Sequence, residues 1–210
     1  MKIRAVIFDM DGVLIDAREW HYLALNQALG FFSLEICRAD HEGEFDGLPT
    51  RDKLHLLSKR EGLPVALHAF INEMKQRYTE QYIYQHCWPV FEHQYALARL
   101  KESGYRLAVA SNSIRHTIET MLTRAHLLPH LDFFLSNEDV VHGKPDPEIY
   151  QKAIQRLELK PQECVVVEDN PHGIAAARAA GASVLEVCDP SEVTWSRIRS
   201  FIAQCEGDKS

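Results

Sequence analysis

Two carboxylates close an apolar run near the amino terminus, in the stretch "VIFDMDGVLIDA" from Val6 to Ala17. Asp9 and Asp11 are two positions apart, and in extended chain such residues share a face at a separation of roughly 6 to 7 Å. One carboxylate could then contact a phosphorus atom while the other reaches its ester oxygen. This spacing predicts phosphoryl transfer, in which Asp9 attacks phosphorus and Asp11 acts as general acid and later as general base.

Further polar groups follow the later apolar runs. Ser111 and Asn112 end "RLAVASN", Lys144 comes shortly after "FFLS", and Glu168 with Asp169 end "CVVVED". In an open parallel sheet, ligands bind at the carboxyl ends of the strands, so we expect these groups to share one crevice with the first two carboxylates. Lys144 and Ser111 would bind the transferring phosphate oxygens, and Asn112 is a further candidate for phosphate binding.

The density of carboxylates calls for a cation, because an anionic nucleophile must approach an anionic phosphate. Oxygen ligands favour Mg²⁺ over zinc, so we expect a magnesium site. Its candidate residues are Asp9, Asp11, Glu168 and Asp169, with a main-chain carbonyl near Asp11 as one ligand.

Each assignment has a structural alternative. The sequence "DMDG" also forms ordinary Asx turns, and Ser111 could cap the following helix. Glu168 and Asp169 could stabilise a helix N-terminus electrostatically, and Lys144 could be an exposed surface lysine. The occurrence of all these groups at successive strand ends favours the shared site.

Continuous apolar runs predict strands that are buried on both faces of a parallel sheet. The five candidates are "AVIF" from Ala5, "RLAVAS" ending at Ser111, "FFLS" ending at Ser136, "CVVVED" from Cys164 and "ASVLEV" from Ala182. Helical spacing of apolar residues lies between the later strands, as in the run from Ile114 to Ala125. Strands that alternate with helices predict an α/β fold with a Rossmann-like parallel sheet.

The gap between the first two strands is far longer than one crossover helix needs. Its pattern is helical throughout and contains no strong strand, so we expect an inserted α-helical cap domain. The predicted division is an α/β core of residues 1–16 and 89–210 with a helical cap of residues 17–88.

Composition restricts the possible partners and location. The chain has 210 residues and a formal net charge of -7, which argues against a nucleic-acid partner. The five cysteines are scattered, without a C-x-x-C pair, and favour a reducing compartment. Because no apolar stretch approaches the length of a membrane span and the chain begins directly with a strand, we expect a cytoplasmic protein without a membrane partner. The oligomeric state stays open, and a monomer is compatible with the sequence.

Together the motifs resemble those of the haloacid dehalogenase superfamily, in its phosphatase and phosphomutase branch with a helical cap. "DMDGVLID", "VASNS", "GKPDPEIY" and "VVVEDNPHGIAAARAAGA" look like the four motifs of that family in order. The likeness implies Asp9 as nucleophile, Asp11 as general acid and base, and Ser111 and Lys144 as phosphate binders. It assigns Glu168 and Asp169 to the metal side of the site.

The cap residues bear on the choice of substrate. "DAREWH" resembles a stretch of β-phosphoglucomutases that includes its histidine, here His21, although Ala17 replaces the serine or threonine usual there. Thr50, Arg51 and Lys75 are further candidates for substrate contact. A structural histidine and ordinary surface charge are the alternatives for these four positions.

We therefore expect a Mg²⁺-dependent phosphatase that acts on a small phosphorylated metabolite, such as a sugar phosphate, through an aspartyl-phosphate. The alternatives are a β-phosphoglucomutase-like sugar phosphomutase and a non-catalytic regulator that binds a phosphorylated ligand. A metal-independent dehalogenase is disfavoured, because such relatives lack an acid equivalent to Asp11 and do not need Glu168 and Asp169.

Overall fold

The computed structural model of the chain describes residues 2–45 and 47–207. The chain divides into two compact units, one of residues Met1–Asp16 and Trp88–Ser210 and the other of Ala17–Cys87. The five cysteines are free thiols. No helix in the described ranges is long and apolar enough to cross a membrane.

The first unit contains a five-stranded sheet in which every paired neighbour is parallel, with the order β3-β2-β1-β4-β5. The strands are β1 (Ala5–Phe8), β2 (Arg106–Ala110), β3 (Phe133–Leu135), β4 (Cys164–Glu168) and β5 (Ser183–Glu186). All five predicted strands are confirmed, as is the Rossmann-like α/β class. The predicted bounds of β1 match the structure, and those of the other four strands extend one residue too far, at both ends in β5.

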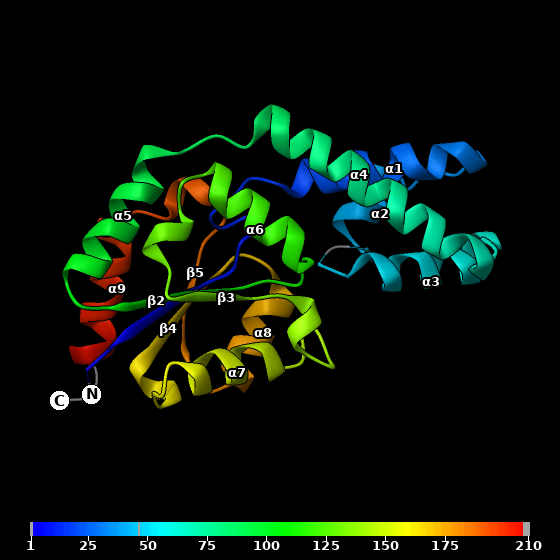
Figure 1. Ribbon diagram of the computed structural model, residues 1–210. Helices are drawn as coiled ribbons and strands as arrows, with labels where there is room; N and C mark the ends of the chain where they lie inside the picture. Colours follow the sequence, from blue (N-terminus) through cyan, green and yellow to red (C-terminus); the bar gives the residue numbers. More distant parts are fainter. Residues whose placement is uncertain (1, 46, 208–210) are drawn as a thin grey trace. The chain divides into compact units, whose positions relative to one another are not determined.

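Helices cover both faces of this sheet, which explains why its strands read as continuous apolar runs. Helices α7 and α8 pack on one face, and α5, α6 and α9 lie on the other (Figure 1). Their bounds are α5 (Phe91–Glu102), α6 (Arg115–Arg124), α7 (Glu148–Arg156), α8 (Pro171–Ala179) and α9 (Trp195–Gly207). Short 3-10 turns occur at η3 (Leu128–His130), η4 (Asn137–Asp139), η5 (Pro161–Glu163) and η6 (Pro190–Glu192).

Alternate residues of the central strands build the core beneath α7 and α8. Ala5 and Ile7 of β1 pack there with Val166 of β4, against Ile149 and Ala153 of α7. All these side chains are almost fully buried. The sheet is therefore held rigidly between helices. The residues that directly follow its strands are fixed in position because the strands are.

The strand order changes direction beside β1. The chain runs from β1 outward through β2 to β3, and it then returns to β4 on the other side of β1. In open α/β sheets the loops diverge at such a switch point and leave a crevice outside the carboxyl ends of the strands. The end of β1 is thus the place where this fold favours a ligand site.

The second unit is helical in its described residues. It contains α1 (Arg18–Leu29), η1 (Gly30–Phe32), α2 (Arg38–Glu42), α3 (Thr50–Glu61), η2 (Val65–Leu67) and α4 (His68–His86). Helices α1 and α4 pack side by side, and Leu25, Leu29, Leu54 and Ile71 contribute to a buried apolar core. The unit thus has its own hydrophobic centre.

Candidate active site

The first unit gathers the predicted polar groups at the carboxyl ends of its strands. Asp9 directly follows β1, Ser111 follows β2, and Glu168 is the last residue of β4. Lys144 lies in the connection between β3 and α7. These four side chains are buried, with exposed fractions of 7% for Asp9, 1% for Ser111, 1% for Glu168 and 6% for Lys144.

Lys144 joins the first strand to the fourth through an ion-pair triad. Its Nζ donates to Asp9 Oδ1 at 2.6 Å and to Glu168 Oε1 at 2.6 Å. Burial by itself would lower the pKa of Lys144, but the carboxylates of Asp9 and Glu168 outweigh this effect and raise it above its ordinary value. The lysine is therefore a permanent cation inside the site and not a surface residue.

Asp9 is in the opposite electrostatic situation. Burial raises the pKa of the Asp9 carboxyl well above its ordinary value, Lys144 lowers it, and the neighbouring carboxylate of Glu168 raises it further. One lysine therefore does not balance the negative charge that gathers here. A second positive charge at this place would favour the ionised form of Asp9.

The loop that carries Lys144 is fixed by Asn112. The side-chain Oδ1 of Asn112 accepts from the Lys144 N–H at 3.1 Å, and its Nδ2 donates to the Lys144 carbonyl at 3.4 Å. A Cβ on Gly143 would lie 3.0 Å from the same Oδ1, which makes that contact tight. The side-chain amide of Asn112 is thus occupied in positioning Lys144, and phosphate binding by this residue stays a prediction.

Glu168 is held on all sides by groups from the chain. The Tyr150 hydroxyl of α7 donates to Oε1 at 2.7 Å, while Oε2 accepts from the main-chain N–H groups of Asp169 at 2.9 Å and Asn170 at 3.1 Å. Gly173 of α8 makes room for it, because an added Cβ there would lie 1.7 Å from Oε1. These contacts fix the Glu168 side chain, which in turn orients Lys144.

Asp11 faces the end of β2. Its Oδ2 accepts from Ser113 Oγ at 2.7 Å and from Ser111 Oγ at 3.4 Å. Gly12 has a φ of 90°, a conformation that L side chains rarely adopt, and it lets the chain turn immediately after Asp11. The two serines therefore hold the predicted acid and base beside the predicted nucleophile.

Asp9 also belongs to a group of three carboxylates that could bind a metal ion. Asp9, Glu168 and Asp169 each present a ligand atom within 4.8 Å of the others. All three donors are carboxylate oxygens, a set that suits a hard cation such as Mg²⁺ and not zinc. Asp11 does not belong to this group, and its place at a metal ion stays a prediction.

Sequence reasoning missed three residues that shape this site: Ser113, Tyr150 and Gly173. Ser113 carries a usable signal, because it stands two positions after Ser111 at a strand end. Tyr150 lies in the apolar pattern of α7 and is 0% exposed, so it reads as an ordinary core residue. Gly173 stands inside a helix, where its close approach to Glu168 has no local signature.

The candidate substrate residues of the second unit fall into two groups. His21 of α1 and Lys75 of α4 are brought together, with Lys75 Nζ 3.1 Å from His21 Nδ1, and Lys75 is buried. Thr50 and Arg51 begin α3, and Arg51 Nε pairs with Asp52 Oδ1 at 3.2 Å on an exposed face. Contact of these four residues with a substrate stays a prediction.

Comparison with known proteins shows the family of the chain. The family described as haloacid dehalogenase-like hydrolase matches residues 6–187, a span that contains every group of the site described above. The chain belongs to that family. The matched span includes the sheet, apart from Ala5, and the helical insertion, as the motif resemblance predicts.

The chain is also similar to individual relatives and to solved structures. The chain is 30% identical over 189 residues to the pyrophosphatase PpaX of Bacillus cereus, covering 89% of this chain and 84% of that protein. It shares its fold with β-phosphoglucomutase from Clostridium difficile, with a TM-score of 0.83, 21% identity and coverage of 96% and 98%. It is also similar to CbbY from Rhodobacter sphaeroides in complex with phosphate, with a TM-score of 0.80, 22% identity and coverage of 88% and 85%.

Proposed function

We propose that the chain is a Mg²⁺-dependent phosphatase that hydrolyses a small phosphorylated metabolite through an aspartyl-phosphate on Asp9. The observation that carries this proposal is the buried carboxylate of Asp9 at the end of β1, paired at 2.6 Å with Lys144 and next to two further carboxylates. Membership of a family of hydrolases and similarity to a pyrophosphatase support an enzyme that acts on phosphate esters or anhydrides.

The reaction proceeds in two displacements. A carboxylate oxygen of Asp9 attacks phosphorus, the bond to the leaving oxygen breaks, and Asp11 donates its proton to that oxygen. Asp11 then takes a proton from a water molecule, whose oxygen attacks the aspartyl-phosphate and releases inorganic phosphate together with the original Asp9. Ser111 and Ser113 keep Asp11 in place during both proton transfers.

Lys144 serves as the fixed positive charge for the transferring phosphoryl oxygens. It is buried and held by Glu168, so little reorganisation is needed when negative charge develops at phosphorus. Asp9, Glu168 and Asp169 would hold Mg²⁺, which when bound supplies the charge neutralisation that lets an anionic phosphate approach an ionised Asp9.

The second unit is proposed as the cap that reads the leaving group. The His21–Lys75 pair gives it a polar centre between α1 and α4. This pair, and the likeness of "DAREWH" to β-phosphoglucomutases, favour a sugar phosphomutase as the second candidate. In that case a substrate hydroxyl, and not water, takes the phosphoryl group from Asp9.

The deciding experiment is a panel of sugar phosphates and pyrophosphate, assayed with Mg²⁺ for free phosphate and by phosphorus NMR for isomerised product. Phosphate release supports the phosphatase, whereas isomerisation with little free phosphate supports the mutase. Asp9→Asn should lower turnover by about 10³-fold or more, because the nucleophile is lost. The matched control is Glu119→Gln on the exposed face of α6, which should retain full activity.

Two outcomes would contradict parts of this proposal, the first the role of Asp9 and the second the enzyme activity itself. Wild-type turnover in the Asp9→Asn variant would show that Asp9 is not the nucleophile. Binding of phosphorylated compounds without either product, across the whole panel, would favour the non-catalytic regulator.

A further inference from the structure

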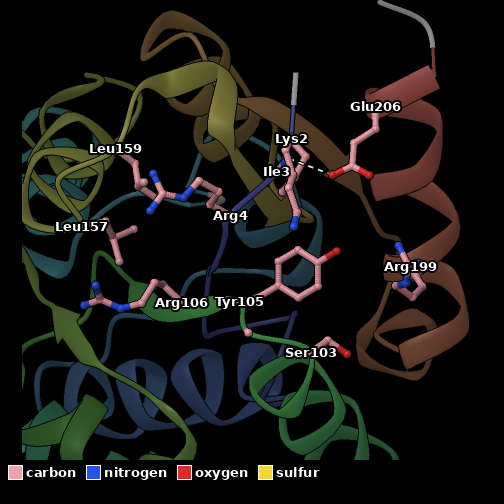
Figure 2. Close-up of a pocket in the computed structure, with 11 residues that line it drawn as sticks. Lys2, Ile3, Arg4, Ser103, Tyr105, Arg106, Leu157, Leu159, Arg199 and Glu206 are labelled. Atoms are coloured by element: carbon pink, nitrogen blue, oxygen red, sulfur yellow. Dashed lines mark hydrogen bonds between the residues drawn. The ribbon is translucent and has the colours of Figure 1, made fainter.

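A cavity lies at the opposite edge of the same sheet from the candidate active site. It has a volume of about 490 Å³ and is lined by residues at the amino ends of β1 and β2 and by residues of α9 (Figure 2). Arg4 immediately precedes β1, and Arg106 is the first residue of β2. Asp9 follows the other end of β1, so this cavity is separate from the candidate active site.

The cavity is rich in cations although the chain as a whole has a net charge of -7. Four of its lining residues, Lys2, Arg4, Arg106 and Arg199, are basic and only Glu206 is acidic. Glu206 Oε1 accepts from the main-chain N–H of Ile3 at 2.9 Å, which ties this carboxylate to the chain itself. The lining therefore has a local excess of positive charge.

The four cations are not equally available. Arg106 pairs with Asp132 at 2.9 Å, and Arg4 reaches Glu163 only at 3.5 Å. In residues 2–45 and 47–207, neither Lys2 nor Arg199 makes an ion pair or a side-chain hydrogen bond, and both are exposed. Lys2 and Arg199 are thus free to neutralise an anion from solution.

Tyr105 supplies a neutral donor between these two cations. Its hydroxyl points into the space between Lys2 and Arg199 in Figure 2. Among the described residues it has no hydrogen-bond partner. On the other side of the tyrosine ring, Leu157 and Leu159 lie beside Arg4 and Arg106 and give the cavity an apolar wall (Figure 2).

We propose that this cavity binds a small phosphate monoester whose organic part is apolar or aromatic. Lys2, Arg199 and the Tyr105 hydroxyl hold the phosphate, and the organic part lies against the tyrosine ring and the leucines. Arginine and lysine are the side chains best suited to phosphate oxygens. The volume is in the usual range for small-molecule sites, and a bare phosphate ion would fill only a small part of it.

A purely structural role for these cations makes a different prediction. Helices α5 and α9 end at Glu102 and Gly207, near this edge of the sheet, and cations stabilise the partial negative charge of helix C-termini. That role needs neither a cavity nor a tyrosine hydroxyl. It predicts a loss of stability on substitution and no binding of phosphate esters.

The test is calorimetric titration with adenosine 5′-monophosphate as the probe. The full chain carries Asp9→Asn, so that hydrolysis does not consume the probe. Lys2→Gln and Arg199→Gln should each weaken binding about tenfold or more, because each removes a charged phosphate contact. Arg197→Gln removes a cation from the same helix outside the cavity and should leave the affinity unchanged.

Two further probes separate the parts of the proposed ligand. Adenosine and inorganic phosphate should both bind more weakly than the monophosphate, since each lacks half of the recognised chemistry. The proposal is overturned by absence of binding at millimolar probe, by equal affinity in all three variants, or by equally tight binding of either fragment. The assay reads binding alone, so its outcome is independent of the proposed phosphatase activity.

Discussion

The two edges of the sheet in the first unit treat positive charge in opposite ways. At the carboxyl edge, Lys144 is 6% exposed and makes two ion pairs at 2.6 Å. At the amino edge, Lys2 and Arg199 are exposed and make no ion pair within the described residues. Lys144 at the first edge is part of the internal charge balance of the fold, whereas Lys2 and Arg199 at the second edge are available to a ligand.

The difference follows from the energetics of desolvation. Removing one partner from a buried ion pair leaves an uncompensated charge in a poorly solvated place, which is strongly destabilising. An exposed cation stays hydrated, so its removal costs the fold little. Substitution of Lys144 at the carboxyl edge should therefore lower the stability of the fold strongly. Substitution of Lys2 or Arg199 at the amino edge should weaken ligand binding and change the stability little.

The largest effect is expected for Lys144→Met. The change leaves the carboxylates of Asp9 and Glu168 buried without their cation, and it should lower the free energy of unfolding by about 3 to 5 kcal/mol. Chemical denaturation at neutral pH measures this loss. Lys101→Met, at an exposed lysine of α5, should stay within about 1 kcal/mol of the wild type. Equal stability of the two variants would contradict the triad as a structural element.

Gly173→Ala should have a smaller effect at the same edge. The added methyl group would lie 1.7 Å from Glu168 Oε1, so the carboxylate or α8 must move, and we expect a loss of about 1 to 3 kcal/mol. Turnover should fall as well, because Glu168 orients Lys144. Gly30→Ala is the control, since Gly30 has a φ of -58° and nothing within 4 Å of an added Cβ. Indistinguishable effects of the two changes would show that α8 tolerates a side chain there.

Glu148 anchors the loop that carries Lys144, and its effect should depend on pH. The hydrogen bond from Lys152, followed by those from the main-chain N–H groups of His142 and Val141, lowers the pKa of Glu148 from 4.5 to about 2. A lowered pKa in the folded state means that the ionised carboxylate stabilises the fold above about pH 4.5 and that this contribution is lost as the pH falls toward 2.

Glu148→Gln should therefore unfold at a lower temperature than the wild type at pH 7, and the difference should shrink below pH 4.5. Thermal unfolding followed by circular dichroism across pH 3 to 7 measures it. Glu119→Gln on α6 provides a matched charge change at an exposed site. A difference from wild type that stays constant over the whole pH range would mean that the charge of Glu148 does not stabilise the loop.

The smallest stability change is expected at the amino edge. The double variant Lys2→Gln with Arg199→Gln should unfold within about 0.5 kcal/mol of the wild type, as exposed substitutions usually do. A loss of stability as large as that of Lys144→Met would show that the cations at both edges stabilise the fold to the same degree. It would assign Lys2 and Arg199 to the fold and not to a ligand.

Much of this architecture is predictable from the sequence because it depends on local patterns. The run "AVIF" reads as a strand buried on both faces, and β1 spans the same residues, Ala5–Phe8. Ile118, Met121 and Leu122 recur at helical spacing and are buried in α6. Asp9 and Glu168 could be placed in one crevice because parallel strands align their carboxyl ends.

Partners that are distant in sequence could not be predicted in this way. Lys144 and Asp9 are separated by 135 positions, and no periodicity records that their side chains meet at 2.6 Å. The Tyr150 hydroxyl is hidden in an apolar helix pattern, yet it donates to Glu168. The basic cavity could not be predicted because its cations come from three segments that are far apart in the sequence and that only the fold brings together.

The sequence by itself determined which side chains stand at the strand ends, since apolar runs and the acids that follow them are local properties of the chain. Only the tertiary structure decided which of those side chains pair, which are buried and which stay open to solvent. The physical reason is that burial and ion pairing depend on how helices α7, α8 and α9 pack around the sheet, and this packing brings together residues with no local relation to one another.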